Sequence, residues 1–182
     1  MPSIYLSPST QEFNPYVIGG NEEYYMNLIA DAMEPYLYAT GISFTRNTPD
    51  MTAASSIAAS NSGNYDLHLA LHSNASGSAS ASGSVRGSEV YYYPSSINGR
   101  RAAEIIANNL QIIYPLPDRV KTVPTTTIGE VRRTRAPSVL IEFAYHDNYD
   151  DAVWIRDNIN AIAQNVVISL ADYFGIPFRM PE

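Results

Sequence analysis

The sequence predicts an α/β protein, a single-domain three-layer sandwich in which a twisted, largely parallel (mixed) sheet carries helices on both faces. Short β-prone runs alternate with segments of helical periodicity along the chain, which is typical of parallel sheets with crossover helices. The length of 182 residues suits one domain, and no internal repeat divides it. We therefore expect one domain over residues 1–182.

The first half of the chain alternates between the two kinds of element. Apolar runs with strand periodicity are separated by segments in which apolar residues recur at helical spacing. Asn and Asp residues before the helical segments are suitable N-caps. The predicted elements are, in order, a strand over 4–6, a helix that Asn21 caps and Pro35 ends or kinks, a strand over 42–46, a helix that Asp50 caps and that ends at 61–63, and a strand over 65–72.

The second half begins with a low-complexity stretch of Ser, Gly and Ala. Its composition cannot bury a core, so we expect a flexible surface loop over about residues 76–88 that interrupts the domain without dividing it. The elements predicted after it are a strand over 88–93, a helix over 101–113 that Pro115 and Pro117 close, an edge strand or extended loop over 122–128, a buried strand over 138–143 and a final helix over 152–174.

Composition excludes several classes of function. Eleven Lys and Arg against eighteen Asp and Glu give a net charge of −7 and a pI near 4.9, which argues against a nucleic-acid partner. The absence of cysteine excludes disulfides, thiolate metal sites and a Cys nucleophile. No apolar stretch is long enough to span a membrane, and the N-terminus lacks the basic and apolar regions of a signal peptide.

Histidines and a carboxylate at strand ends are the main chemical signal. His68 and His72 share one face of the 65–72 strand but stand about 13 Å apart at about 3.3 Å per residue, so they cannot share one ion. His72, at the strand end, is the better ligand, and His68 is expected to pack lower down. Glu142 ends the 138–143 strand, and His146 follows it. Because sites in α/β sheets gather at the carboxyl ends of strands, the pattern indicates a metal hydrolase.

Several segments, in order along the chain, resemble the zinc-dependent N-acetylmuramoyl-L-alanine amidases, a family of peptidoglycan hydrolases. The likeness extends from Leu6 to Phe174, and its order is more specific than any single piece. The segments are Leu71–Asn74, Gly87–Tyr92 and Ala136–Phe143 with Asn148 beyond, together with Glu23–Asn27 on the first helix, Gly41–Arg46 on the second strand and Asn61 at the end of the next helix.

The resemblance assigns roles to four residues. It makes Glu23 and His72 ligands of a catalytic zinc ion and Glu142 the catalytic carboxylate. Glu142 would take a proton from the attacking water and pass it to the leaving amine. Arg132, five residues before Pro137, matches an arginine that would bind a peptide carboxylate or the developing oxyanion, although a surface ion pair is an equal alternative.

The first zinc ligand of the family is missing. Family members leave the first strand through Asp-Pro-Gly-His-Gly-Gly, whereas Ser7–Glu12 reads Ser-Pro-Ser-Thr-Gln-Glu and holds no histidine. Catalytic zinc ordinarily takes three protein ligands and an open position. His146 is the first candidate for the third ligand, because a turn after Glu142 could fold it over the site, and Gln11 is the second. The remaining alternatives are another residue or no third ligand.

The resemblance implies hydrolysis of the amide bond between N-acetylmuramic acid and L-alanine in peptidoglycan. Two alternatives stay open, a non-catalytic muropeptide-binding module that has lost the first ligand, and an amidohydrolase of the same fold with another substrate. The implied partner is peptidoglycan, and we expect a monomer. The implied place of action is the cell wall, outside the membrane, as for an autolysin or a phage endolysin.

Overall fold

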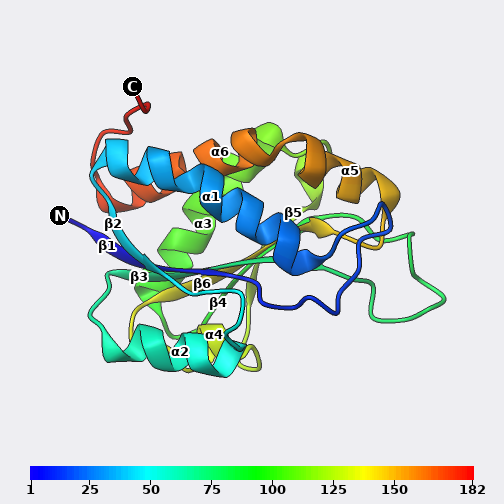
Figure 1. Ribbon diagram of the computed structural model, residues 1–182, viewed down its shortest axis with the longest axis horizontal. Helices are drawn as coiled ribbons and strands as arrows, with labels where there is room; N and C mark the ends of the chain where they lie inside the picture. The colour runs from blue at the N-terminus through cyan, green and yellow to red at the C-terminus, as the bar shows by residue number, and fades with distance from the viewer.

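The computed structural model describes all 182 residues and contains one six-stranded sheet in the order β2-β1-β3-β6-β4-β5 (Figure 1). The strands are β1 (Ser3–Pro8), β2 (Ser43–Arg46), β3 (Leu67–Asn74), β4 (Ser88–Tyr92), β5 (Val120–Pro124) and β6 (Ser138–Tyr145). The helices are α1 (Glu22–Thr40), α2 (Ala53–Ser62), α3 (Ile97–Ile113), α4 (Gly129–Arg132), α5 (Tyr149–Asp157) and α6 (Ile159–Phe174), with the short 3-10 helix η1 (Pro117–Arg119) before β5.

Strand direction determines where polar groups can meet. Strands β2, β1, β3 and β6 are parallel, β4 runs antiparallel to β6, and β5 is parallel to β4. Helices cover both faces, α1, α3, α5 and α6 on one side and α2 and α4 on the other (Figure 1). The predicted three-layer sandwich with a mixed, largely parallel sheet is therefore confirmed. The carboxyl ends of β1, β3 and β6 and the beginning of β4 lie at the same end of the sheet.

One face of the sheet carries the main hydrophobic core. Side chains of Leu6, Leu69 and Ile141 are fully buried there against α1 and α6, which contribute Met33 and Val166. Each fully buried side chain of this kind stabilises the fold by about 1.5–3 kcal/mol. This packing holds the sheet rigid beneath the polar groups of the opposite face.

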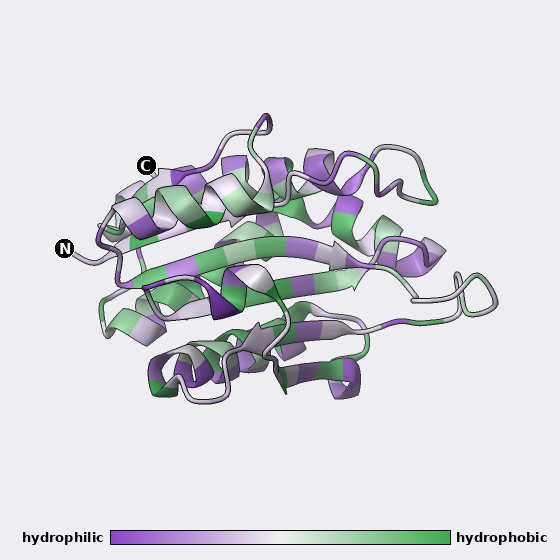
Figure 2. Cartoon of the chain, turned by 90° about the horizontal axis from the view of Figure 1, so that it is seen from below, coloured by the Kyte–Doolittle hydropathy of each residue, from purple (hydrophilic) through white to green (hydrophobic).

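The opposite face is polar because side chains alternate along a strand. In β3, Leu67, Leu69 and Leu71 point into the main core, so His68 and His72 point the other way. Hydrophilic residues accordingly interrupt the hydrophobic strands toward their ends (Figure 2). A small apolar cluster formed by Ala70, Val131 and Leu140 lies on this side.

Two helix predictions for the first half need correction. The first helix does not end at Pro35 but continues to Thr40, because its apolar residues stay buried beyond the proline, and it ends at Gly41 in the left-handed conformation (φ 78°). The second helix is capped by Thr52 rather than Asp50, since Thr52 forms a reciprocal capping box with Ser55.

Three further differences concern the second half. Helix α3 begins at Ile97, behind a Ser96 cap, rather than at 101. The helix predicted over 152–174 is divided at Asn158 into α5 and α6. The segment predicted over 122–128 contains the end of the edge strand β5, and the one-turn helix α4 that follows was not predicted. No helix combines the length and apolar character needed to cross a bilayer.

Candidate active site

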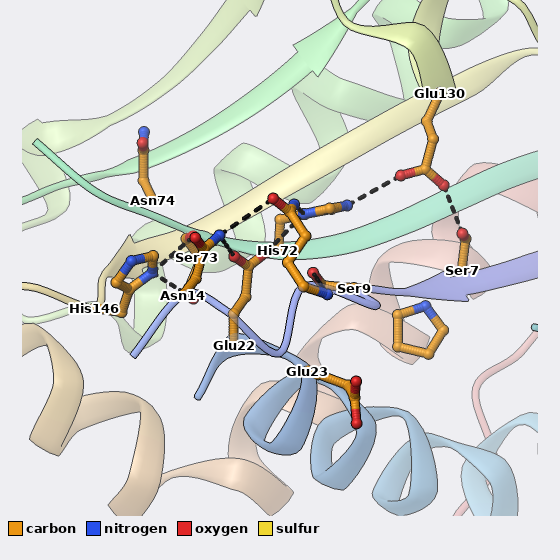
Figure 3. Close-up of polar contacts among 12 residues, drawn as sticks. Ser7, Ser9, Asn14, Glu22, Glu23, His72, Ser73, Asn74, Glu130 and His146 are labelled. Carbon is orange, nitrogen blue, oxygen red and sulfur yellow. Dashed lines mark hydrogen bonds and ion pairs between the residues drawn. The ribbon is translucent and has the colours of Figure 1, made fainter. Parts of the chain in front are cut away.

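His72, near the end of β3, is the centre of the site and is 7% exposed. Its Nδ1 atom lies 2.7 Å from Glu22 Oε1, and its Nε2 atom lies 3.0 Å from Glu130 Oε2 (Figure 3). Burial alone would lower the pKa of His72, but the hydrogen bonds and charges of Glu130 and Glu22 raise it well above its ordinary value. The imidazole is thus a buried cation between two carboxylates.

Glu22 reaches His72 from the first turn of α1. Asn21 caps this helix by accepting a hydrogen bond from the backbone N–H of Tyr24, which places Glu22 at the first helical position. Its carboxylate is buried and accepts a second hydrogen bond, of 2.6 Å, from Asn14 Nδ2. Burial alone would raise the pKa of Glu22, but His72 and Asn14 hold it below its usual range. The helix N-terminus also favours the negative charge.

Glu130 supports His72 from the other side. It lies on the one-turn helix α4 and is 5% exposed. Besides His72, its carboxylate accepts hydrogen bonds from Ser7 Oγ (2.5 Å) and His68 Nε2 (3.2 Å). Burial would raise the pKa of Glu130, but these two histidines hold it far below its usual range. One carboxylate therefore joins β1, β3 and α4 beneath the site.

We expect Glu130→Gln to lower the free energy of unfolding by about 3 kcal/mol, because the buried His72 cation loses a charged partner. Urea denaturation of the wild type and the variant measures this loss. Glu104→Gln is the control, since Glu104 pairs with Arg100 on the exposed face of α3 and should change stability little. Equal losses in the two variants would contradict the supporting role of Glu130.

Glu142 is the unpaired carboxylate of the site. It stands opposite His72 in the β3–β6 register, so the two side chains share the polar face. The residue is partly exposed, yet its Oε2 atom is buried and has no hydrogen-bond partner. Burial raises the pKa of Glu142 to about 8, because the His72 cation does not fully offset it and Glu22, Glu89 and Glu130 add negative charge. Such a group can hold or release a proton near neutral pH.

The loop after β1 contributes amides to the site. The Gln11 side-chain amide lies 3.3 Å from His72 Nδ1, and Gln11 Oε1 accepts a hydrogen bond from Asn14 Nδ2. Because Asn14 also donates to Glu22, the two amides and the carboxylate surround one side of the imidazole. Gln11 thus occupies the space beside the Nδ1 atom of His72.

Comparison with known proteins identifies the family. A family model described as N-acetylmuramoyl-L-alanine amidase matches residues 14–172. The chain belongs to the N-acetylmuramoyl-L-alanine amidase family. The resemblance noted in the sequence is therefore confirmed, and with it the expectation of a peptidoglycan amidase at the level of the family. None of the curated protein sequences matches this chain.

Solved structures, two of which are named as amidases, have the same fold. The amidase AmiC2 of Nostoc punctiforme has a TM-score of 0.83 at 18% identity, with 96% of this chain and 97% of that chain covered. The catalytic domain of CwlV from Bacillus (Paenibacillus) polymyxa var. colistinus has a TM-score of 0.81 at 16% identity, covering 97% and 100%. Cwp6 from Clostridium difficile has a TM-score of 0.82 at 21% identity, covering 94% of this chain and 29% of that chain.

The structure does not bring Glu23, the ligand that the amidase resemblance suggested, to His72. Glu23 is one residue further around α1 and points away from the His72 cluster (Figure 3). It lines a surface groove together with Asn27 and Arg46. Successive residues of a helix are about 100° apart, so only one of two neighbouring glutamates can face the sheet. Glu22 takes the place that we expected for Glu23.

His146 and Arg132 also lie apart from the amidase site. His146 donates from Nδ1 to the Ser73 carbonyl (2.9 Å) and stacks on Tyr16, and no hydrogen bond joins it to His72 or Glu22. Arg132 is exposed on α4, and no hydrogen bond or ion pair joins it to Glu142. Of the residues expected at the site, the structure brings His72, Glu142 and Gln11 together.

Two residues of the site were missed in the sequence. Glu22 is the first of two glutamates directly after the helix cap, and this Glu-Glu pair is the signal that could have found it. Glu130 gave no signal, because it lies in a polar segment and its contact to His72 spans 58 residues of sequence. His68 was expected to pack lower on the strand, and it is fully buried against Ser60 and Glu130.

The side chains around His72 include donors for the zinc ion that the family implies. Glu22 and His72 direct a carboxylate oxygen and an imidazole nitrogen toward one another, and Glu130 orients the ring from its far side as carboxylates do for zinc-binding histidines. Gln11 is the third side chain at this point. Its Nε2 atom faces His72 and its Oε1 atom accepts from Asn14, so the amide oxygen, a weak zinc ligand, would reach the metal only after the amide group turns over. The residues fit a zinc ion with two strong donors and one weak one.

Proposed function

We propose that the chain hydrolyses the amide bond between N-acetylmuramic acid and L-alanine in peptidoglycan, acting as a monomer at the cell wall outside the membrane. Family membership supports the reaction class. The observation that carries the proposal is the position of Glu142, an unpaired carboxylate in register with His72 on the polar face of the sheet. An amide hydrolase needs a proton acceptor and donor at this kind of position.

Zinc is part of the proposal, with Glu22 and His72 as its ligands and the Gln11 amide as the third donor. Zinc bound there would supply Lewis-acid chemistry by polarising the scissile carbonyl. His72 would give up the Nδ1 proton that it now donates to Glu22, because a ligating nitrogen must be unprotonated. Glu130 would keep its hydrogen bond to Nε2 and so hold the ring in place.

Glu142 would move the protons of the reaction. It takes a proton from the attacking water, and the same carboxyl group then donates it to the nitrogen of the leaving L-alanine, which is a poor leaving group until it is protonated. Its place on β6, next to the rigid core, holds the carboxyl group at a fixed distance from the site. The position of its Oε2 atom, free of protein partners, leaves it available for this exchange.

Digestion of purified peptidoglycan by the zinc-supplemented protein tests the proposal. Labelling of new amino termini with dinitrofluorobenzene, followed by mass spectrometry, should find new L-alanine termini and intact N-acetylmuramic acid. New reducing sugar ends, or new termini on other amino acids, would contradict it. A chain treated with a zinc chelator is the control and should release much less alanine.

A second candidate is a non-catalytic muropeptide-binding module. The observation that favours it is the replacement of the family's first ligand by the weak donor Gln11. Saturable binding of muropeptides without any release of alanine termini at saturating zinc would establish this function in place of hydrolysis.

A further inference from the structure

A row of charged side chains continues across the sheet beyond Glu142. Glu89 on β4 is in register with Glu142 on one side and with Lys121 on β5 on the other. Paired positions of neighbouring strands direct their side chains to the same face. Strands are about 4.8 Å apart, so Lys121 stands about 10 Å from Glu142 along this row.

The row ends at a small pocket with cationic walls. The pocket has a volume of about 280 Å³, and its charged lining residues are Arg86, Glu89, Arg119 and Lys121. The chain carries a net charge of −7, yet three of its eleven cations line this one pocket, Lys121 being the only lysine. Because Asp150 and Asp151 neutralise Arg86, two cations, Arg119 and Lys121, remain against the carboxylate of Glu89, and the pocket is positive in a negative protein.

The charges of the pocket differ in how they are held. Arg86 is bound to Asp150 and Asp151, so its position is fixed. Arg119 and Lys121 are exposed, and neither side chain forms a hydrogen bond or an ion pair with the protein. These two cations are therefore free to bind a ligand.

Neighbouring contacts occupy the carboxylate of the pocket and fix the backbone beside it. Glu89 Oε2 accepts hydrogen bonds from Tyr91 Oη (2.5 Å) and Asn74 Nδ2 (3.2 Å), and Glu89 forms no ion pair with either free cation. Gly87 has φ 148° and approaches the Arg119 carbonyl so closely that a Cβ atom there would lie 3.0 Å from the oxygen. This close approach fixes the backbone of Arg119 against the beginning of β4.

We propose that this pocket binds a carboxylate of the peptide stem on the leaving side of the scissile amide. This inference rests on the proposed function, which places the amide bond at Glu142. An extended peptide advances about 3.3–3.6 Å per residue, so a carboxylate two or three residues beyond the bond lies about 7–11 Å away, at the distance of Lys121. Arg119 and Lys121 supply the charge, and the pocket selects stems with a free carboxylate.

NMR titration with L-alanyl-D-glutamic acid, which has two carboxylates, and with its diamide, which has none, tests this inference. Both are product-like dipeptides that the chain does not consume. We expect the wild type to bind the acid about tenfold more tightly than the diamide, with shifts at Arg119 and Lys121 that weaken at high salt.

The double substitution Arg119→Gln and Lys121→Gln should bring the two affinities to within about twofold of each other. Both side chains are exposed, so the fold should be kept, and thermal unfolding checks this. Arg100→Gln, which removes an exposed cation of α3, is the matched control and should keep the preference.

Three results would overturn the inference: equal affinity of the wild type for acid and diamide, no saturable binding of the acid, or a preference that survives the double substitution. Hydrolysis is measured separately on peptidoglycan. A chain that hydrolyses without preferring the acid refutes this inference alone, and a chain that prefers the acid without hydrolysing refutes the proposed reaction.

Discussion

Glu142→Gln should lower the rate of amide hydrolysis by a factor of about 10²–10⁴, the usual contribution of a positioned general acid–base group. Glutamine keeps the shape of the side chain but cannot take a proton from water or give one to the leaving nitrogen. The Oε2 atom of Glu142 forms no hydrogen bond with the protein, so replacing it breaks none. The effect should therefore fall on catalysis rather than on stability.

Measurement of kcat and of stability in the same variant separates these effects. The release of L-alanine termini should fall, while the urea midpoint and the binding of muropeptides stay close to those of the wild type. Glu89→Gln, at the neighbouring register position, is the control and should lose far less activity because Glu89 is already bonded to Tyr91 and Asn74. Equal losses in the two variants, or full activity of Glu142→Gln, would contradict the assignment.

The raised pKa of Glu142 connects this residue to the proposed zinc ligands. With a pKa of about 8, the carboxyl group holds a proton at neutral pH and is suited to donate it but not to accept one. A divalent cation at Glu22 and His72 would lower the pKa of Glu142, because it adds positive charge next to a buried carboxyl group. Cation binding at Glu22 and His72 would therefore allow Glu142 to act as a base.

The elements on which the site depends could be predicted where periodicity is strong. Alternation of Leu67, Leu69 and Leu71 was enough to place His68 and His72 on one face. The apolar run before Glu142 was enough to place this carboxylate on a strand, although β6 continues beyond it to Tyr145. The resemblance then set these elements in the order of a known family. The local pattern acts over short stretches and the family order over nearly the whole chain, and both agreed with the fold.

Contacts between distant segments were not predictable in the same way. The choice between Glu22 and Glu23 depends on the rotation of α1 about its axis relative to the sheet. The helix begins directly after its N-cap, Asn21, and a start one residue later would change which glutamate faces His72. Glu130 lies on a single helical turn, too short for a periodic signal, and only the packing of α4 brings it to His72. His146 was expected to fold back over the site, but the Ser73 carbonyl binds its Nδ1 atom.

Gln11→His should raise the affinity for zinc by about tenfold or more, because an imidazole nitrogen is a much better zinc ligand than an amide oxygen. The side chain at position 11 already lies beside His72 Nδ1 and within reach of Glu22, so a histidine there would complete a set of two histidines and one glutamate. Competition with a zinc-binding chelator of known affinity measures the change.

The position of the new histidine makes this prediction specific. Thr10, rather than Gln11, corresponds to the family's histidine when Ser7–Glu12 is compared with the family segment residue by residue. The structure places the Gln11 side chain at His72, so Thr10→His should leave zinc affinity unchanged. His72→Ala in the Gln11→His background should abolish the gain. A larger gain from Thr10→His would show that the loop after β1 directs a different residue to the metal.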